Sequence, residues 1–308
     1  MQIRTDLAME SREWAQNPRG VSVRTLRHGA IEETHVTVET EEAAAALEKA
    51  MGRYITLSFQ DIAHAEPEER IALSRTLADT LRSLVPPFGD LMVVGLGNRH
   101  ITADALGSRV LESLLITRHM KDVTEVCIRD RLRGVCAVAP GVLGITGMET
   151  AEMVQGIVDR VKPVAVIAID ALAARESGRI CTTIQVTDTG IRPGSGVGNH
   201  RMGLTRDTLG VPVIAIGVPM VVYAAVIARD ALTLLMQDMG IAEQDHEQAL
   251  DQLIGKVIKE GLGDMVVTPR EVDELVGRVA EIIAEGINLA LQPRLTEDEI
   301  SHLVHDGM

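Results

Sequence analysis

Aromatic residues and cysteines are scarce in this chain, and each shortage excludes a class of protein. One Trp, two Tyr and two Phe occur among 308 residues, so a core must be built from Val, Ile, Leu, Met and Ala. The three cysteines, Cys127, Cys136 and Cys181, form no C-x-x-C pair. They provide neither a disulfide framework nor a zinc site of that pattern, and they favour a reducing, cytoplasmic environment.

Positive charge is also in short supply. The chain has 30 Lys and Arg against 44 Asp and Glu, a formal net charge of −14. An acidic surface repels nucleic acids and anionic membranes, so we expect neither as a partner. The N-terminal residues lack the apolar run of a signal peptide. The longest apolar segment, residues 211–226, is interrupted by Pro212, Gly217 and Pro219, and it is too short to span a bilayer.

Several familiar motifs are incomplete. The stretch GLGNRH (residues 95–100) begins like a dinucleotide fingerprint, but His100 stands where its third glycine is needed. The loop RPGSGVGNHR (residues 192–201) lacks the G-K-[ST] ending of a phosphate-binding loop. Ser195 does not lie in a G-x-S-x-G elbow, because position 193 is Pro. No H-E-x-x-H occurs among the nine histidines, and we expect no cofactor.

The hydrophobic pattern predicts an α/β protein. Continuous apolar runs alternate with helical segments, which is typical of a mostly parallel sheet flanked by helices. Short strands before residue 60 predict a small N-terminal β annex, and the chain after residue 243 predicts three C-terminal helices. Strands are predicted at 21–26, 35–40, 53–59, 91–95, 135–139, 164–169, 182–188 and 211–218. Helices are predicted at 41–52, 67–85, 104–120, 148–161 and 219–240, with a short helix after residue 170.

Two D-A-L triplets, at Asp104 and Asp170, each follow an apolar run. Because the carboxyl ends of parallel strands meet at one edge of a sheet, we expect both carboxylates in one crevice. Such a pair can activate a water molecule and protonate a leaving amine. Two other interpretations stay open. Both residues could be helix N-caps, or they could bind a metal ion together with His100 or His200.

The chain resembles a known family in several long motifs that occur in order: VGLGN, TADALG, APGVLGITGMET, VIAIDALAAR, TIQVTDTGIRPGSGVGN, LGVPVIAIGVP and VTPREVDELV. The family is the germination protease of spore-forming bacteria, and the resemblance runs from residue 4 to about residue 291. It implies a tetrameric, aspartic-type endopeptidase in the forespore or spore core. It also implies small acid-soluble spore proteins as substrates and a fold related to hydrogenase maturation proteases.

The resemblance assigns the two catalytic aspartates to Asp104 and Asp170. It also implies a zymogen that removes its own N-terminus at a site of the form Thr-(Glu/Asp)-apolar-Ala-x-Glu, cut after the acid. Residues 5–10, TDLAME, fit that form, so self-cleavage is expected between Asp6 and Leu7. Residues 1–6 would then be a pro-segment and residues 7–308 a single protease domain. The same stretch could instead be an edge strand or a frayed start.

Further residues are expected to line the cleft. They lie in the loops around 97–98, 140–150 and 189–201 or after the second aspartate: Gly97, Asn98, Thr146, Gly147, Glu149, Arg175, Asp188, Ser195, Asn199 and His200. The sequence departs from the family where Met220 and Tyr223 replace a Thr and an Asp. These departures leave open a catalytically degenerate binding protein. A metal-dependent hydrolase on the same scaffold, with Asp104, Asp170 and His200 as ligands, is a second alternative.

Overall fold

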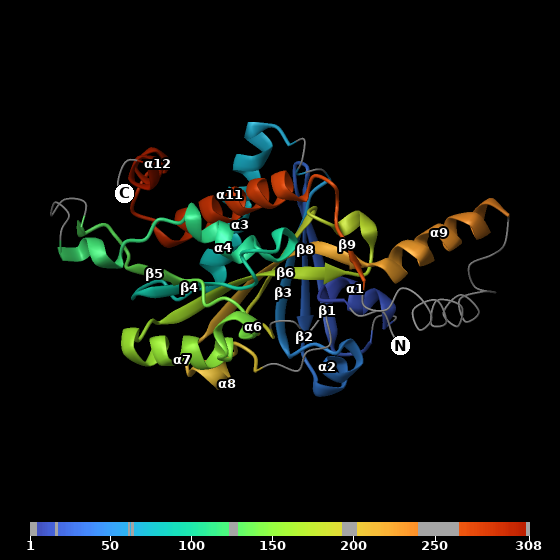
Figure 1. Cartoon of the computed structure of the whole chain (residues 1–308), viewed down its shortest axis with the longest axis horizontal. Coiled ribbons are helices and arrows are strands. Elements are labelled where there is room, and N and C mark those ends of the chain that lie inside the picture. The colour runs from blue at the N-terminus through green and yellow to red at the C-terminus, as the bar shows by residue number, and fades with distance from the viewer. Residues whose placement is uncertain are drawn as a thin grey trace.

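The structure is a computed structural model, and it describes residues 5–15, 18–60, 62, 65–122, 129–192, 202–239 and 265–305. Its centre is one nine-stranded sheet with the strand order β1-β2-β3-β7-β8-β6-β4-β5, and β9 pairs with β8 outside that order (Figure 1). The strands are β1 (Val21–His28), β2 (Ile31–Val38), β3 (Gly52–Ser58), β4 (Leu91–Gly95), β5 (Val135–Val138), β6 (Ala165–Ala174), β7 (Thr183–Thr187), β8 (Val213–Tyr223) and β9 (Val266–Val267).

The helices lie on both faces of this sheet. They are α1 (Ala8–Trp14), α2 (Glu41–Leu47), α3 (Pro67–Leu84), α4 (Leu106–Glu112), α6 (Leu143–Thr146), α7 (Thr150–Val161), α8 (Arg206–Leu209), α9 (Ala224–Asp238), α11 (Val272–Leu291) and α12 (Glu297–His305). Short 3-10 helices are η1 (Thr102–Asp104), η2 (Arg118–Asp122) and η3 (Ser177–Arg179). The predicted α/β class, with flanking helices and C-terminal helices, is confirmed.

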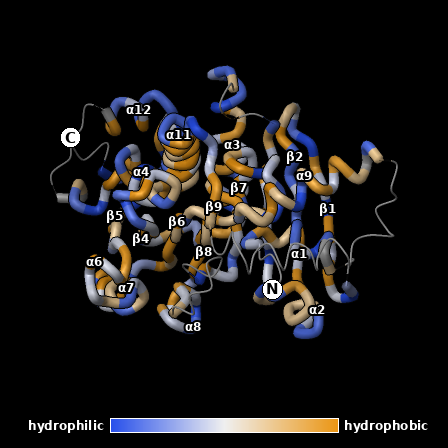
Figure 2. The backbone as a smooth tube through the Cα atoms, turned by 45° about the vertical axis from the view of Figure 1, so that its right-hand side comes forward, coloured by the Kyte–Doolittle hydropathy of each residue, from blue (hydrophilic) through white to orange (hydrophobic). Residues whose placement is uncertain are grey.

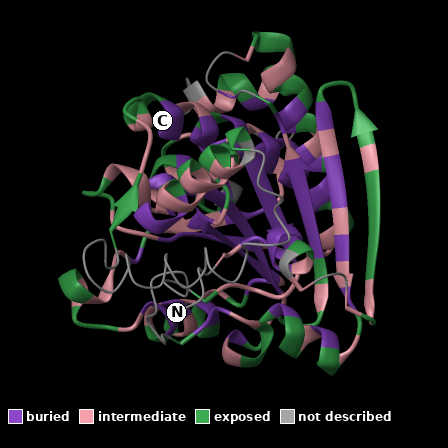
Figure 3. Ribbon diagram, turned by 90° about the vertical axis from the view of Figure 1, so that its right-hand side faces the viewer, coloured by how far each residue is buried: buried purple, intermediate pink, exposed green. Residues whose placement is uncertain are grey.

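The sheet is mixed. Strands β5, β4, β6 and β8 pair in parallel, whereas β7, β3, β2 and β1 continue the sheet in antiparallel pairs. The antiparallel share is thus larger than the hydrophobic pattern indicates. The predicted N-terminal annex is not separate, because β3 pairs with β7 and joins the first three strands to the main sheet. Strand β1 forms one edge and is largely exposed (Figure 3).

Alternate side chains of the central strands fill cores on opposite faces of the sheet. On β6, Ile167 and Ile169 belong to the core shared with α3, α4 and α11. Val166 and Ala168 point the other way and pack with residues of α7 and α8. Figure 2 shows apolar residues concentrated in these central strands and in α11. Asp170 follows in the series of Val166 and Ala168, so its side chain lies on the α7 face.

The short helix predicted after residue 170 is wrong, and the helix predicted over residues 219–240 starts later, as α9 at Ala224, because strands continue through both places. Strand β6 runs on to Ala174 instead of ending before a short helix, and β8 runs to Tyr223. The two extensions pair with each other, across a register shift between Leu172 and Ala173 opposite Pro219. Proline, which has no N–H to donate, is tolerated at such an irregularity. The apolar run at 219–223 has the composition of a helix as much as of a strand, so only the partner strand decides.

The predicted helix over residues 104–120 is also shorter than expected. It divides into the end of η1, helix α4 and η2, with an irregular segment, Ser113–Thr117, between the last two. Helix α11 supplies the hydrogen bonds of this segment through Asn288. Its Oδ1 accepts from the Leu115 N–H at 2.8 Å, and its Nδ2 donates to the Ser113 carbonyl at 3.1 Å. A distant side chain therefore decides this local conformation.

Candidate active site

Asp170 lies within β6, at the first position beyond the end of β4. Gly95, the last residue of β4, pairs with Ile169, and the Leu96 N–H donates to the Ile169 carbonyl at 2.8 Å. The chain then turns away into a loop and leaves Asp170 at the new edge of the sheet. Its Oδ1 accepts from the Ala171 N–H at 3.0 Å. Only 7% of the residue is exposed, although it carries a carboxylate.

Asp104 reaches the same place from the loop after β4. The loop folds back on itself, so that Asp104 Oδ2 accepts from the Asn98 N–H at 2.7 Å. Gly97 makes this turn possible with a positive φ of 94°. A Cβ atom at Gly97 would lie 1.9 Å from the Asp104 carbonyl oxygen, so a side chain has no room there. Asp104 is the last residue of η1, and its side chain is half-buried.

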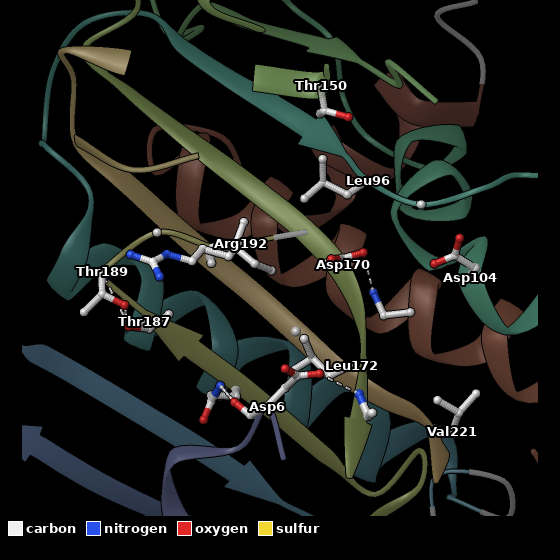
Figure 4. Close-up of a pocket in the computed structure, with 18 of the residues that line it drawn as sticks. Asp6, Leu96, Asp104, Thr150, Asp170, Leu172, Thr187, Thr189, Arg192 and Val221 are labelled. Carbon is white, nitrogen blue, oxygen red and sulfur yellow. Dashed lines mark hydrogen bonds between the residues drawn. The ribbon is translucent and has the colours of Figure 1, made fainter. Parts of the chain in front are cut away.

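The two carboxylates line one cavity of about 830 Å³ (Figure 4). Figure 4 shows them on neighbouring walls, Asp170 on β6 and Asp104 on the loop beside it. The expectation that both acids gather at one edge of the sheet is therefore met by the geometry. The helix-cap interpretation is wrong for both residues, because Asp170 lies inside a strand and the N-cap of α4 is Ala105.

The strand predicted at residues 182–188 does not belong to the parallel set, because β7 runs antiparallel to β8 and its last residue, Thr187, pairs with Ala215. Both Gln185, in the middle of β7, and Thr187, at its end, line the cavity. Gln185 pairs with Gly217, and Gly217 pairs with Asp170. Paired residues point to the same face, so Gln185 and Asp170 share a face with a glycine between them.

The other predicted cleft residues have diverse positions. Gly97 lines the cavity, and Asn98 hydrogen-bonds to Asp104. The remaining described candidates do not line the cavity. Gly147 and Glu149 cap α6 and α7, and the Thr146 hydroxyl hydrogen-bonds within its own loop. The Arg175 N–H donates to Glu10, and Asp188 forms an ion pair with Arg53 at 2.7 Å. Ser195, Asn199 and His200 lie outside the described residues.

Both family departures lie on β8, and neither lines the cavity. Met220 is fully buried in the core on the α3 and α11 side, where the Cys181 thiol lies 3.6 Å from its sulfur. Burial raises the pKa of that thiol to about 11. Tyr223 ends β8 and pairs with Val266. Val221, between the two, is the residue of this stretch that faces the cavity.

The chain's own N-terminal segment enters this cavity. The Asp6 N–H donates to the Ala173 carbonyl at 3.1 Å, and the Ala173 N–H donates to Asp6 Oδ2 at 2.9 Å. Gln185 binds on both sides of Leu7: its Nε2 donates to the Asp6 carbonyl at 3.1 Å, and its Oε1 accepts from the Ala8 N–H at 2.7 Å. Lys49 Nζ donates to the Thr5 carbonyl at 2.9 Å. Sequence reasoning missed Gln185 and Lys49.

A signal for one of these two residues is present in the sequence. Gln185 is a polar residue in the middle of the apolar strand TIQVT, and a buried amide needs hydrogen-bond partners. Lys49 lies in the loop after α2, where a lysine is unremarkable, so nothing local identifies it. Burial lowers the pKa of Lys49, and the nearby carboxylates of Asp6, Glu10 and Glu48 act in the opposite direction.

Residues after Asp6 are built into the fold. Leu7 is fully buried in a second cluster with Val36, Tyr54 and Leu172, and helix α1 starts at Ala8. Glu10 is 3% exposed, and its carboxylate accepts the N–H groups of Arg175 at 2.9 Å and Glu176 at 3.1 Å and pairs with Arg179 at 3.3 Å. Burial nevertheless raises the pKa of Glu10.

Within the described part of the chain, no three His, Cys, Asp or Glu residues are grouped as a metal site would need. None of the helices described is long and apolar enough to cross a membrane. An α/β fold with two carboxylates in a cavity that also holds an extended peptide segment has the features of a hydrolase that acts on peptides.

Comparison with known proteins identifies the family. The family model for germination protease matches residues 2–259 and 239–303. The chain belongs to the germination protease family, and it is a peptidase. A germination protease of Clostridium acetobutylicum is 44% identical over 98% of this chain and 99% of its own length. One from Caldanaerobacter subterraneus is 43% identical over 98% of both chains, and one from Bacillus subtilis is 36% identical over 96% and 95%.

Among solved structures, a NiFe hydrogenase maturation protease from Thermococcus kodakarensis matches with a TM-score of 0.33 and 18% identity. The match covers 68% of this chain and 98% of that one.

Proposed function

We propose that this chain is an aspartic-type endopeptidase in which Asp104 and Asp170 share the acid–base work on one water molecule. One carboxylate takes a proton from the water while its oxygen attacks the peptide carbonyl carbon. The other, protonated, carboxyl gives a proton to the amide nitrogen as the carbon–nitrogen bond breaks. The observation that carries this proposal is that both acids lie in the cavity that Asp6 also lines, Asp170 on β6 and Asp104 in the segment that follows the neighbouring strand β4.

Main-chain N–H groups of the glycine-rich loops around 140–150 and 189–201 would stabilise the developing oxyanion. Gly141 and Gly190 line the cavity, which supports a role for these loops.

We also propose that the chain processes itself between Asp6 and Leu7, which would make residues 1–6 a pro-segment and 7–308 the protease domain. Two contacts support this: Asp6 lies in the same cavity as the two catalytic acids, and Gln185 holds the main chain on both sides of that bond. In this form Asp6 pairs with Ala173, three residues along β6 from Asp170.

The substrates in trans would be small acid-soluble spore proteins, and the site of action the cytoplasm of the forespore or the spore core. The family name of the relatives, germination protease, supports this assignment. We further propose a homo-oligomer, a tetramer as the family resemblance implies. The second half of α9 extends away from the sheet and exposes Leu234 and Leu235, and Met239 directly after the helix is exposed too, which supports a surface covered by another copy (Figure 1).

The direct test replaces each acid by its amide. We expect Asp104→Asn and Asp170→Asn to lower kcat/KM by roughly 10²- to 10⁴-fold, because each removes one half of the proton transfer. The substrate is the nine-residue peptide of residues 4–12, RTDLAMESR. Asp159→Asn, an exposed acid on α7, is the matched control and should leave the rate unchanged. Near-normal turnover in either cavity variant would end the two-aspartate mechanism.

The unaltered chain and the Asp170→Asn variant also distinguish the aspartic-type peptidase from a metal-dependent hydrolase and from a degenerate binding protein. Activity that EDTA abolishes and zinc or manganese restores would favour a metal-dependent hydrolase. No cleavage of any peptide, together with no loss of residues 1–6 by intact mass, would favour a degenerate binding protein. We expect EDTA-insensitive cleavage and a mass loss that Asp170→Asn blocks.

A further inference from the structure

The Thr5–Asp6 segment lies against an open edge of β6. Strand β4 stops opposite Ile169, and in the described structure no other strand pairs with β6 beyond that point on the β4 side. The Ala173 carbonyl accepts the Asp6 N–H, which is a main-chain contact that any extended peptide can make. The Ala173 N–H donates to the Asp6 carboxylate instead, so this second contact depends on the side chain. This edge of β6 is thus a site where a peptide can add to the sheet.

The contacts to this segment divide into two kinds. Gln185 recognises main chain alone, because it bonds to the Asp6 carbonyl and the Ala8 N–H. Ala173 and Lys49 can recognise the acid itself. The Ala173 N–H binds the Asp6 carboxylate, and the ammonium of Lys49 is fixed at the adjoining Thr5 carbonyl, within the cavity that Asp6 lines. A half-buried cation beside a carboxylate is worth more than an exposed one, because water screens it less.

The place of Thr5–Asp6 becomes available once residues 1–6 leave. Leu7 and the residues after it belong to a buried cluster and to α1, so they remain in the fold. Lys49, the Nε2 group of Gln185 and the main chain of Ala173 then face the cavity without the residues that they held. The Oε1 of Gln185 keeps its bond to the Ala8 N–H, which fixes the orientation of the amide. These groups are fitted to a dipeptide that ends in an acid.

We propose that Lys49, Gln185 and the main chain of Ala173 form the subsite that selects an acidic residue on the N-terminal side of the bond cut in trans. The proposal rests on the proposed peptidase function and assigns its specificity to named residues. Lys49 selects for the charge of the acid, and Gln185 aligns the main chain whatever the side chain is. Lys49 is the cation to test, because its ammonium donates to the Thr5 carbonyl beside Asp6.

The experiment compares two peptides on one preparation of the full-length chain. One is RTDLAMESR, and the other has Asn in place of the Asp. Their ratio of kcat/KM does not depend on how much of the preparation is active. We expect the unaltered chain to prefer the Asp peptide by roughly 10- to 100-fold, the effect of one or two charge-assisted hydrogen bonds. Lys49→Met should reduce that preference about tenfold or more.

Two controls make the result specific. Gln185→Met should lower kcat/KM for both peptides to a similar extent and keep the ratio, because it removes main-chain contacts. Lys162→Met replaces a lysine at the far end of α7, about 18 Å along the helix from Thr150, and should change neither value.

Each outcome has one meaning. Loss of the preference in Lys49→Met, with the preference kept in Gln185→Met and Lys162→Met, supports the proposal. A preference that survives Lys49→Met, or an unaltered chain that cuts both peptides equally well, overturns the proposal and leaves the peptidase function standing. If the unaltered chain cuts neither peptide, the peptidase function falls and the subsite falls with it.

Discussion

At the scale of single residues, the position of Asp104 depends on a glycine. Gly97 adopts a positive φ and brings the main chain against the Asp104 carbonyl, so the loop closes tightly enough for the Asn98 N–H to reach the carboxylate. Other residues reach such a φ only at a cost, and here a side chain would also collide with main chain rather than with a movable side-chain end. Gly97 therefore fixes the position of the Asp104 carboxylate.

Replacing Gly97 by Ala should damage both stability and activity. The strained φ alone should lower the free energy of unfolding by about 1 to 3 kcal/mol. Displacement of η1 should shift the Asp104 carboxylate by about 1 Å, enough for roughly a 10²-fold loss of kcat/KM. Thermal unfolding and cleavage of RTDLAMESR measure the two effects.

The control for this prediction is Gly156→Ala. Gly156 lies in α7 with an ordinary φ, and a Cβ atom there would meet nothing within 4 Å. This variant should keep full activity and gain up to about 1 kcal/mol from helix propensity. If Gly97→Ala behaves like Gly156→Ala, the loop is not fixed by that contact.

The two acids could be predicted from the sequence, but their surroundings could not. Each D-A-L triplet follows an apolar run, and parallel strand ends meet at one edge, so the pattern alone brings Asp104 and Asp170 together. Lys49 approaches from a loop 55 positions before Asp104, and Gln185 comes from a strand whose direction the pattern does not reveal. Contacts that depend on the order and direction of strands cannot be predicted from a local stretch of sequence.

At the scale of elements, the side chain of Asn288 supplies hydrogen bonds that a continuous helix over residues 104–120 would have made within itself. The apolar spacing of residues 104–120 predicts one continuous helix, yet the chain leaves helical geometry at Ser113. Amides and carbonyls released there would be buried without partners, which is costly. The side chain of Asn288 on α11 satisfies the N–H of Leu115 and the carbonyl of Ser113 together.

Asn288→Leu should therefore be destabilising even though the site is buried and apolar around it. Two main-chain groups lose their partners, which should reduce the free energy of unfolding by about 2 to 4 kcal/mol. Urea titration measures this loss. Glu281→Leu, on the exposed face of the same helix, should change stability by less than about 0.5 kcal/mol. Equal stability of the two variants would show that Ser113–Thr117 finds its hydrogen bonds elsewhere.

At the scale of the whole molecule, the cavity exists because the sheet changes from parallel to antiparallel pairing across its width. The parallel strands β5, β4, β6 and β8 form one half, and antiparallel β7, β3, β2 and β1 form the other. Strand β4 is short, whereas β6 and β8 continue past it and pair with each other. The difference in length leaves an unpaired edge beside Asp170, which the N-terminal segment partly covers. The α/β class can be predicted from the composition and from the alternation of strands and helices. The unequal lengths of the strands cannot be predicted in this way.

The composition of helix α9 does not suit an exposed helix. Leu234 is 65% exposed and Leu235 56% on this helix, which extends from the body of the molecule, and Met239 directly after it is 67% exposed (Figure 1). Apolar side chains gathered on one exposed element usually contact another chain.

We expect light scattering on the purified protein to give a multiple of the 33.2 kDa chain mass. Leu234→Glu combined with Leu235→Glu should shift the mass toward a single chain, because charges are not tolerated in an apolar interface. Phe88→Glu alters an equally exposed apolar residue on another part of the molecule and should leave the mass unchanged. A single-chain mass for the unaltered protein, or an oligomer that survives the double substitution, would assign the exposed leucines another role.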